Sequence, residues 1–178
     1  VIRKQLKKPT GELTKTDLEK VTELNLEGYN LTDVKGLEKL TQLETLHLDF
    51  NQLTDVKGLE KLTHLTGLTL TNNKLTKLPK GLEKLTKLGV LMINNNQLTD
   101  VKGLENLTQL KTLYLNNNQL TDVKGLEKLT LLEELWIVAN QLTNVKGLEK
   151  LTELYALGLG GNQLTSVKGL EKLTKLPS

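Results

Sequence analysis

Three side chains near the start of the sequence, Glu27, His47 and Asp49, are of types that bind metals and catalyse hydrolysis. His47 and Asp49 lie two residues apart, so in an extended strand they point to the same face of a sheet. Glu27 precedes Asp49 by 22 residues, which places the carboxylates on neighbouring strands if the chain repeats with that period. The ligand types suit a divalent transition metal. Because a fourth ligand is missing, an open polar surface is favoured, and no metal or cofactor is predicted.

Enzymatic chemistry finds little support in the sequence. Glu27 and Asp49 on adjacent strands would match the carboxylate separation of a retaining glycosidase, but nothing predicts a cleft that would raise the pKa of either acid. The sequence has no Walker loop, HExxH or GxSxG motif. Gly158, Gly160 and Gly161 resemble the start of a dinucleotide-binding loop but lack its third glycine and helix, and they are expected to leave a shallow notch. We predict that the protein is not an enzyme.

The elements that position these residues come from an internal repeat. The phrase QLTDVKGLEKLT at 52–63 returns unchanged at 119–130 and slightly altered elsewhere. A phrase of the form L-x-x-L-x-L-x-x-N precedes it each time, which makes a unit of 22 residues. The seven units start at Val21, Leu43, Leu65, Leu88, Leu110, Leu132 and Leu154. Such a period indicates a stack of similar coils.

Each unit predicts one short strand and one short helical turn. The alternation in Leu46-His47-Leu48 indicates a strand with its apolar side inward, and the phrase VKGLEKLT indicates a helical or 3-10 turn. One unit buries too few aliphatic side chains to offset the entropy of ordering its backbone, so the units must stack into a parallel sheet. The third unit has an extra residue, Pro79, which should enlarge its turn without shifting the strand register.

A column of asparagines closes the strand phrases. Each amide can both donate and accept hydrogen bonds, so we expect these side chains to satisfy backbone groups where the strand bends into the loop. The first unit has Tyr29 at this position. The predicted column is Asn51, Asn73, Asn96, Asn118, Asn140 and Asn162.

Residues 1–20 do not fit the repeat and hold six Lys or Arg against three Asp or Glu, which accounts for the net charge of +3. Thr14 followed by Asp17 is typical of a helix start. We predict an N-terminal helical cap at 1–20 and seven repeats at 21–178. The sequence opens on Val1 without a signal-peptide pattern, which suggests a mature or excised piece. It has no cysteine, which excludes disulfides and thiolate metal sites.

The motif LxxLxLxxNxL at a period of 22 residues resembles the bacterial, internalin-like leucine-rich repeat, and the resemblance extends from Val21 to Leu176. It implies an α/β fold: a right-handed solenoid with a curved parallel sheet on the concave side and short helical or 3-10 segments on the convex side. It also implies protein–protein recognition, and a secreted or cell-surface bacterial protein rather than a cytoplasmic one.

The outward-pointing strand residues vary between units, whereas the turn phrase barely changes. Met92, Tyr114 and Trp136 occupy one column on successive strands, so they should touch or nearly touch. Exposed aromatic groups with a polar rim are typical anchors of recognition surfaces. The predicted partner-binding residues are His47, Asp49, Phe50, Thr69, Val90, Met92, Asn94, Tyr114, Asn116, Trp136, Val138 and Tyr155.

The predicted partner is a protein or peptide. Acidic residues at 23, 27, 44 and 49 favour basic groups facing the first repeats. The repeats show no basic stripe for nucleic acid, and no apolar run is long enough for membrane insertion. At the other end, leucines of the last repeat should be exposed, which predicts either further chain or end-to-end self-association.

Two alternatives stay open. The aromatic side chains could simply cover the sheet, because exposed apolar residues are common. The chain could also be a structural spacer, or an engineered consensus repeat scaffold without a natural ligand.

Overall fold

Each repeat forms one coil that contains a three-residue strand and a three-residue 3-10 turn. The computed structural model describes residues 1–177. Two short helices come first, α1 (Ile2–Gln5) and α2 (Lys15–Leu18). The strands are β1 (Glu23–Asn25), β2 (Thr45–His47), β3 (Gly67–Thr69), β4 (Val90–Met92), β5 (Thr112–Tyr114), β6 (Glu134–Trp136) and β7 (Ala156–Gly158). The 3-10 turns are η1 (Leu37–Lys39), η2 (Leu59–Lys61), η3 (Leu82–Lys84), η4 (Leu104–Asn106), η5 (Leu126–Lys128), η6 (Leu148–Lys150) and η7 (Leu170–Lys172).

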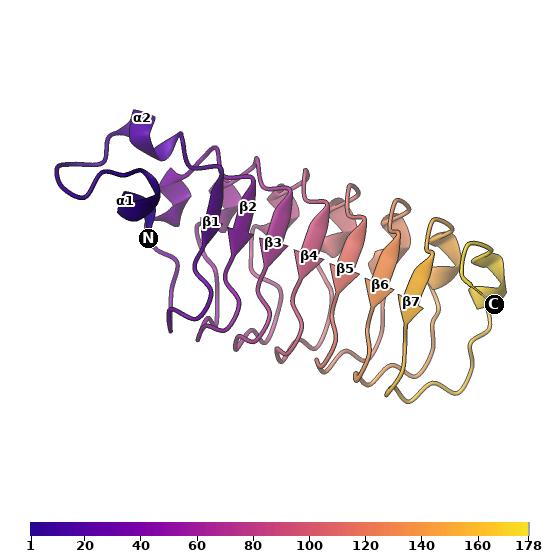
Figure 1. Ribbon diagram of the computed structural model, residues 1–178. Helices are drawn as coiled ribbons and strands as arrows, with labels where there is room; N and C mark the ends of the chain where they lie inside the picture. Colours follow the sequence, from indigo (N-terminus) through magenta and orange to yellow (C-terminus); the bar gives the residue numbers. More distant parts are fainter. Residues whose placement is uncertain (178) are drawn as a thin grey trace.

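The strands form one parallel sheet in which β1 to β7 pair in chain order. Figure 1 shows them side by side, with the 3-10 turns on the opposite side of the coils and α1 and α2 next to β1. The predicted solenoid, with its sheet on one side and 3-10 turns on the other, is confirmed. The hydrogen-bonded strand begins one residue earlier than the Leu-x-Leu pattern suggested, as β2 at Thr45–His47 illustrates.

One continuous aliphatic core fills the space between the sheet and the turns. The central leucine of each middle strand is fully buried and lies in register with its neighbours, as in Leu91, Leu113 and Leu135. Leucines of the turns, such as Leu104 and Leu126, close the core from the other side. The apolar positions of the repeat therefore all serve to join one coil to the next.

The asparagine column ties each coil to the coil before it. The Asn118 side-chain oxygen accepts from the Leu98 N–H at 3.0 Å, and its amide nitrogen donates to the carbonyls of Ile93 and Leu115, both at 3.1 Å. The same pattern recurs from Asn51 to Asn140, all of which are buried. The predicted structural role is confirmed, and the last copy, Asn162, makes its bonds while half-buried.

The glutamate of each GLEK phrase caps the 3-10 turn that it belongs to. Gly58 adopts a left-handed conformation at φ 106°, and its N–H donates to the Glu60 carboxylate at 2.7 Å. Hydrogen bonds from the backbone N–H groups of Glu60 and Gly58 lower the pKa of that carboxyl. The spacing of the phrase did not predict this bond. The capping bond recurs in all seven units, which explains why the phrase is so constant.

The inserted residue of the third unit is absorbed on the turn side. Pro79 and the preceding Leu78 are buried, and η3 keeps its 3-10 geometry. Strands β3 and β4 still pair in register, with Gly67 opposite Val90. The predicted local bulge without a register shift is confirmed.

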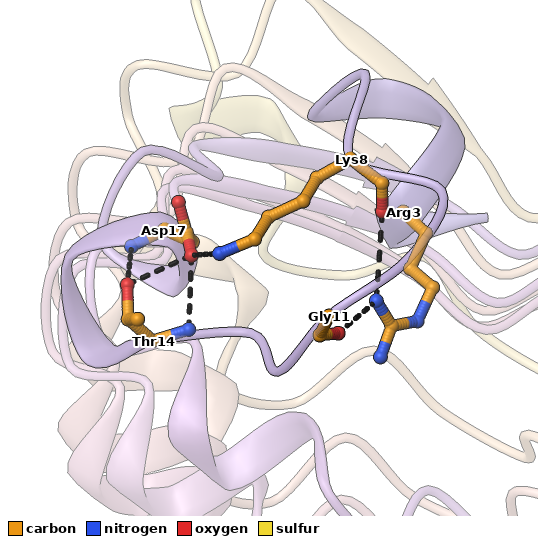
Figure 2. A network of polar contacts seen from close by, with 5 residues as sticks. All are labelled: Arg3, Lys8, Gly11, Thr14 and Asp17. Carbon is orange, nitrogen blue, oxygen red and sulfur yellow. Dashed lines mark hydrogen bonds and ion pairs between the residues drawn. The ribbon is translucent and has the colours of Figure 1, made fainter.

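The N-terminal segment is held by a network of polar contacts around Asp17 (Figure 2). The Thr14 hydroxyl accepts from the Asp17 N–H at 3.2 Å, and the Asp17 carboxylate accepts from the Thr14 N–H at 2.9 Å. This reciprocal capping box confirms the predicted helix start. The Lys8 ammonium reaches the same carboxylate at 2.6 Å, and the Arg3 guanidinium donates to the Gly11 carbonyl at 2.7 Å. That residues 1–20 act as a separate cap stays a prediction.

Acidification is expected to loosen this network. The bond from Lys8, followed by those from Thr14, holds the pKa of Asp17 well below its ordinary value. A lowered folded-state pKa stabilises the fold above the unfolded value of about 3.9, and the stabilisation is lost as pH falls through the folded pKa. Amide exchange at Thr14 and Asp17, expressed relative to the intrinsic rate of an unprotected amide at each pH, should therefore become faster below about pH 4. Asp17→Asn should show the faster exchange already at pH 7 and no longer respond to acid there; identical pH profiles for both proteins would remove this role.

The last coil leaves part of its apolar surface open. Leu157, Leu159, Leu164 and Leu170 are half-buried and thus less open than predicted, whereas Val167 is exposed. Self-association through this edge stays a prediction. None of the helices in residues 1–177 has the length and apolar character required to cross a bilayer.

Candidate functional site

The sheet face, meaning the side of β1 to β7 that points away from the core, carries the variable residues. Along its central column His47, Thr69, Met92 and Tyr114 are half-buried, whereas Trp136 is 37% exposed. Tyr114 and Trp136 lie opposite each other on β5 and β6, with ring centroids 6.4 Å apart in a T-shaped arrangement. The predicted contact within this column is thus present for its two aromatic members, and Met92 is the register partner of Tyr114 on β4.

Four side chains from three consecutive coils form what we term the aromatic–carboxylate cluster: Tyr114, Glu134, Trp136 and Tyr155. The Tyr114 hydroxyl donates to one oxygen of Glu134 at 2.7 Å, and the Tyr155 hydroxyl donates to the other at 2.7 Å. Tyr155 is 48% exposed, whereas Glu134 is half-buried. The cluster is an amphipathic surface in which aromatic rings surround a fixed negative charge.

The hydrogen bonds within the cluster shift the pKa values of its carboxyl and hydroxyl groups. Those from Tyr114 and then Tyr155 lower the pKa of the Glu134 carboxyl. The same bonds raise the pKa of both tyrosine hydroxyls, because each donates to an anion. Glu134 therefore keeps its charge under more acidic conditions than an isolated glutamate.

Gly158 does not form the notch that its sequence suggested, because the Trp136 indole covers it. A Cβ atom placed on Gly158 would lie 2.3 Å from the Trp136 Cε3 atom. Gly158 is buried and is the register partner of Trp136 on β7. The absence of a side chain at this position lets the indole lie across the neighbouring strand.

The column that lies two residues after the central one, which includes Asp49 and Asn94, does more to connect the coils than the sequence indicated. The Asp49 carboxylate accepts from the Thr71 N–H at 2.7 Å, and the Asn94 amide oxygen accepts from the Asn116 N–H at 2.9 Å. Asn116 in turn accepts from the Val138 N–H at 2.8 Å. These half-buried side chains form a second ladder between coils. That a partner also contacts these side chains stays a prediction. Only the atoms that take no part in the bonds between coils are accessible to it.

The residues considered for metal binding do not assemble into a site. The Thr69 hydroxyl donates to Asp49, and the His47 ring nitrogen Nδ1 lies 3.2 Å from the same hydroxyl oxygen. Glu27 is exposed and takes no part in these bonds. Within the described residues, 1–177, no three His, Asp or Glu side chains lie close enough to share an ion. Because Asp49 is already bonded twice, it is also poorly placed to act as a glycosidase nucleophile.

Phe50 stands out at the loop that follows β2. It is 56% exposed and has a φ of 54°, a left-handed conformation that costs most side chains about 1–2 kcal/mol. Asn72, Asn95 and Asn117 hold the equivalent positions of the next units, and asparagine tolerates this conformation better. An exposed aromatic residue in a strained position is a common feature of binding sites.

The remaining predicted residues divide by position along the sheet. Val90 and Val138 are half-buried on the sheet face. The acidic side chains of Glu23, Glu27 and Glu44 are exposed near its N-terminal end. The site residue that sequence reasoning missed is Glu134, which is absent from the predicted partner-binding set. Its position two residues before Trp136 on one strand was the available signal, because residues at that spacing share a face.

Comparisons with known proteins agree with this architecture. The family model described as a leucine-rich repeat region matches residues 50–177, and a model of two leucine-rich repeats matches residues 19–62. No curated protein matches the chain. Internalin C2 of Listeria monocytogenes is similar to it with a TM-score of 0.80 and 27% identity, over 98% of this chain and 88% of that one.

A leucine-rich-repeat protein of Leptospira interrogans is similar with a TM-score of 0.86 and 33% identity, over 94% of this chain; the match spans only 45% of that protein. Proteins with such repeats are commonly binding modules for other proteins and are typically non-catalytic. With the 22-residue unit, the parallel sheet and the family model in agreement, this chain belongs to the leucine-rich-repeat family and is similar in structure to bacterial internalins.

Proposed function

We propose that the protein is a non-enzymatic recognition module that binds a protein or peptide partner on its concave sheet face. The aromatic–carboxylate cluster supports this proposal most directly, because it leaves two large aromatic side chains, Trp136 and Tyr155, exposed close to one half-buried carboxylate on neighbouring coils. Aromatic residues that are held rigidly lose little entropy on binding and dominate many interfaces. The rest of the predicted set, from His47 to Val138, would form the surrounding contact surface.

Charge on the sheet face favours a particular orientation of the partner. Glu23, Glu27 and Glu44 are exposed near β1 and β2, so basic groups of the partner would face the first repeats. The exposed Phe50 lies just beyond β2 and would provide a second apolar contact. The resemblance to internalin-like repeats implies a secreted or cell-surface bacterial protein, and this location also belongs to the proposal.

Combined replacement of Tyr114 and Trp136 by alanine tests the proposal. Both side chains lie on the sheet face outside the core, so the fold should persist while affinity for a captured partner falls 10-fold or more, about 1.4 kcal/mol. Affinity would be measured by calorimetry, with circular dichroism to monitor folding. Tyr29→Ala is the matched control, because it removes an exposed tyrosine from a loop rather than from the sheet face. Unchanged affinity in the double variant would place the contact surface elsewhere, and a spacer protein would yield no saturable partner at all.

A further inference from the structure

The aromatic–carboxylate cluster carries a negative charge that none of its neighbours neutralises. Both hydrogen bonds to Glu134 come from neutral phenol groups. The adjacent Glu133 is paired with Lys111 at 2.8 Å, whereas the ion pairs found in residues 1–177 do not include Glu134. An ionised carboxylate has about four acceptor positions. Each oxygen of Glu134 therefore accepts one phenol hydrogen and keeps capacity for a donor from outside.

The aromatic rings make the same place attractive to a planar cation. The Trp136 indole lies over Gly158 on one side, so its exposed part faces away from the strands. The Tyr114 ring packs edge-on against the indole at an interplanar angle of 75°, and Glu134, two residues before Trp136 on β6, lies on the same face of the strand. A cation over an indole face is attracted by the negative charge of its π-system, and tryptophan is the strongest partner for this contact.

We infer that the cluster receives an arginine side chain of the protein partner, with the guanidinium stacked on Trp136 and donating to Glu134. Arginine fits better than lysine, because its planar group can stack on an aromatic ring and hydrogen-bond a carboxylate at the same time. This inference rests on the proposed recognition function and specifies the chemistry of the partner. Tyr114 and Tyr155 act as positioning residues, because their hydroxyls fix the orientation of the carboxylate.

The ionisation of the cluster is consistent with such a role. Glu134 keeps its charge as the pH falls to the ordinary glutamate pKa of about 4.3, because the tyrosine bonds lower its own pKa. Arginine binding should therefore persist to lower pH in the wild type than in a Tyr114→Phe, Tyr155→Phe double variant. A purely structural role of the two hydroxyls would not move this pH profile.

The single tryptophan of the chain allows a direct test, because its fluorescence reports on this site alone. The probes are N-acetyl-Gly-Arg-Gly-amide and its citrulline counterpart, which has nearly the same shape but no charge. The arginine peptide should change the Trp136 emission and the shift of its indole N–H resonance in a saturable manner. The citrulline peptide should bind at least 10-fold more weakly.

Two charge-matched variants complete the experiment. Glu134→Gln should weaken binding of the arginine peptide at least 10-fold, whereas Glu12→Gln, which removes the charge of an exposed glutamate in the N-terminal segment before β1, should leave it unchanged. Equal binding of both peptides, or equal effects of both variants, would overturn the inference. If the peptide results fail while the Tyr114 and Trp136 double variant still loses the partner, the recognition function stands and only the arginine contact is wrong. If the peptide results hold while that variant binds the partner normally, the cluster binds arginine and the proposed recognition surface is wrong.

Discussion

Replacement of Asn118 by leucine is expected to lower the free energy of unfolding by about 4 kcal/mol. Leucine has nearly the shape of asparagine, so the substitution removes hydrogen bonds without opening a cavity. The Leu98 N–H loses its acceptor, and the carbonyls of Ile93 and Leu115 each lose one of two donors, since Asn96 and Asn140 also donate to them. Asn118 is only 8% exposed, so water cannot replace these partners; the orphaned N–H costs about 1–3 kcal/mol and each lost bond to a carbonyl about 1 kcal/mol.

The measurement is thermal or urea unfolding followed by circular dichroism. For a chain of this size, 4 kcal/mol corresponds to a fall in Tm of roughly 8–16 °C. Gln119→Leu is the control, because it introduces the same side chain at the adjacent, exposed position and should change stability by less than about 0.5 kcal/mol. If the two variants melted at the same temperature, the asparagine column would not stabilise the stack.

Shortening Leu113 to alanine should destabilise the protein by about 3 kcal/mol. Leu113 is fully buried at the centre of β5, between Leu91 and Leu135 of the adjoining strands. The cost combines the lost burial of the side chain with the cavity that remains, because coils that are bonded on both sides cannot close the gap. Each coil contacts only its neighbours, so the damage should be local.

Hydrogen exchange measured by mass spectrometry can locate this damage. Protection should fall most in the coils of β4, β5 and β6 and least in those of β1 and β7. Leu131→Ala provides the control, because Leu131 is 42% exposed and the same truncation there leaves no cavity. A Leu113 variant as stable as the Leu131 variant would show that the core tolerates a missing side chain at its centre.

The fold could be predicted from the sequence because the same pattern of apolar positions recurs in all seven units. Apolar positions such as Leu113 and the closing asparagines recur at fixed places, so strand register and core follow from spacing alone. The short 3-10 turns were expected, but the capping role of residues such as Glu60 was not. A glutamate on an exposed turn is typical of a surface charge, and only the left-handed backbone of Gly58 brings its N–H within 2.7 Å.

The candidate site was harder to predict, because it depends on side-chain directions. Spacing placed Tyr114 and Trp136 in one column, and their contact followed. It did not show that two tyrosines from different coils converge on Glu134, since Tyr155 lies outside the strand and reaches back across it. Nor did it show that Asp49 and Asn116 bond to backbone groups of the next coil. Polar residues on a strand can serve a partner or the scaffold, and their type alone does not distinguish the two.

The buried Pro79 insertion has a consequence for how such a chain can change over time. Its extra residue lengthens one turn while Gly67 and Val90 stay opposite each other, so the spacing of about 4.8 Å between neighbouring strands is preserved. Mutations that alter the length of a turn can therefore accumulate without displacing the outward-facing residues of the sheet. Whole units can also be duplicated or exchanged, and each new unit adds one further strand to the sheet. Specificity and chain length can thus evolve separately in this protein.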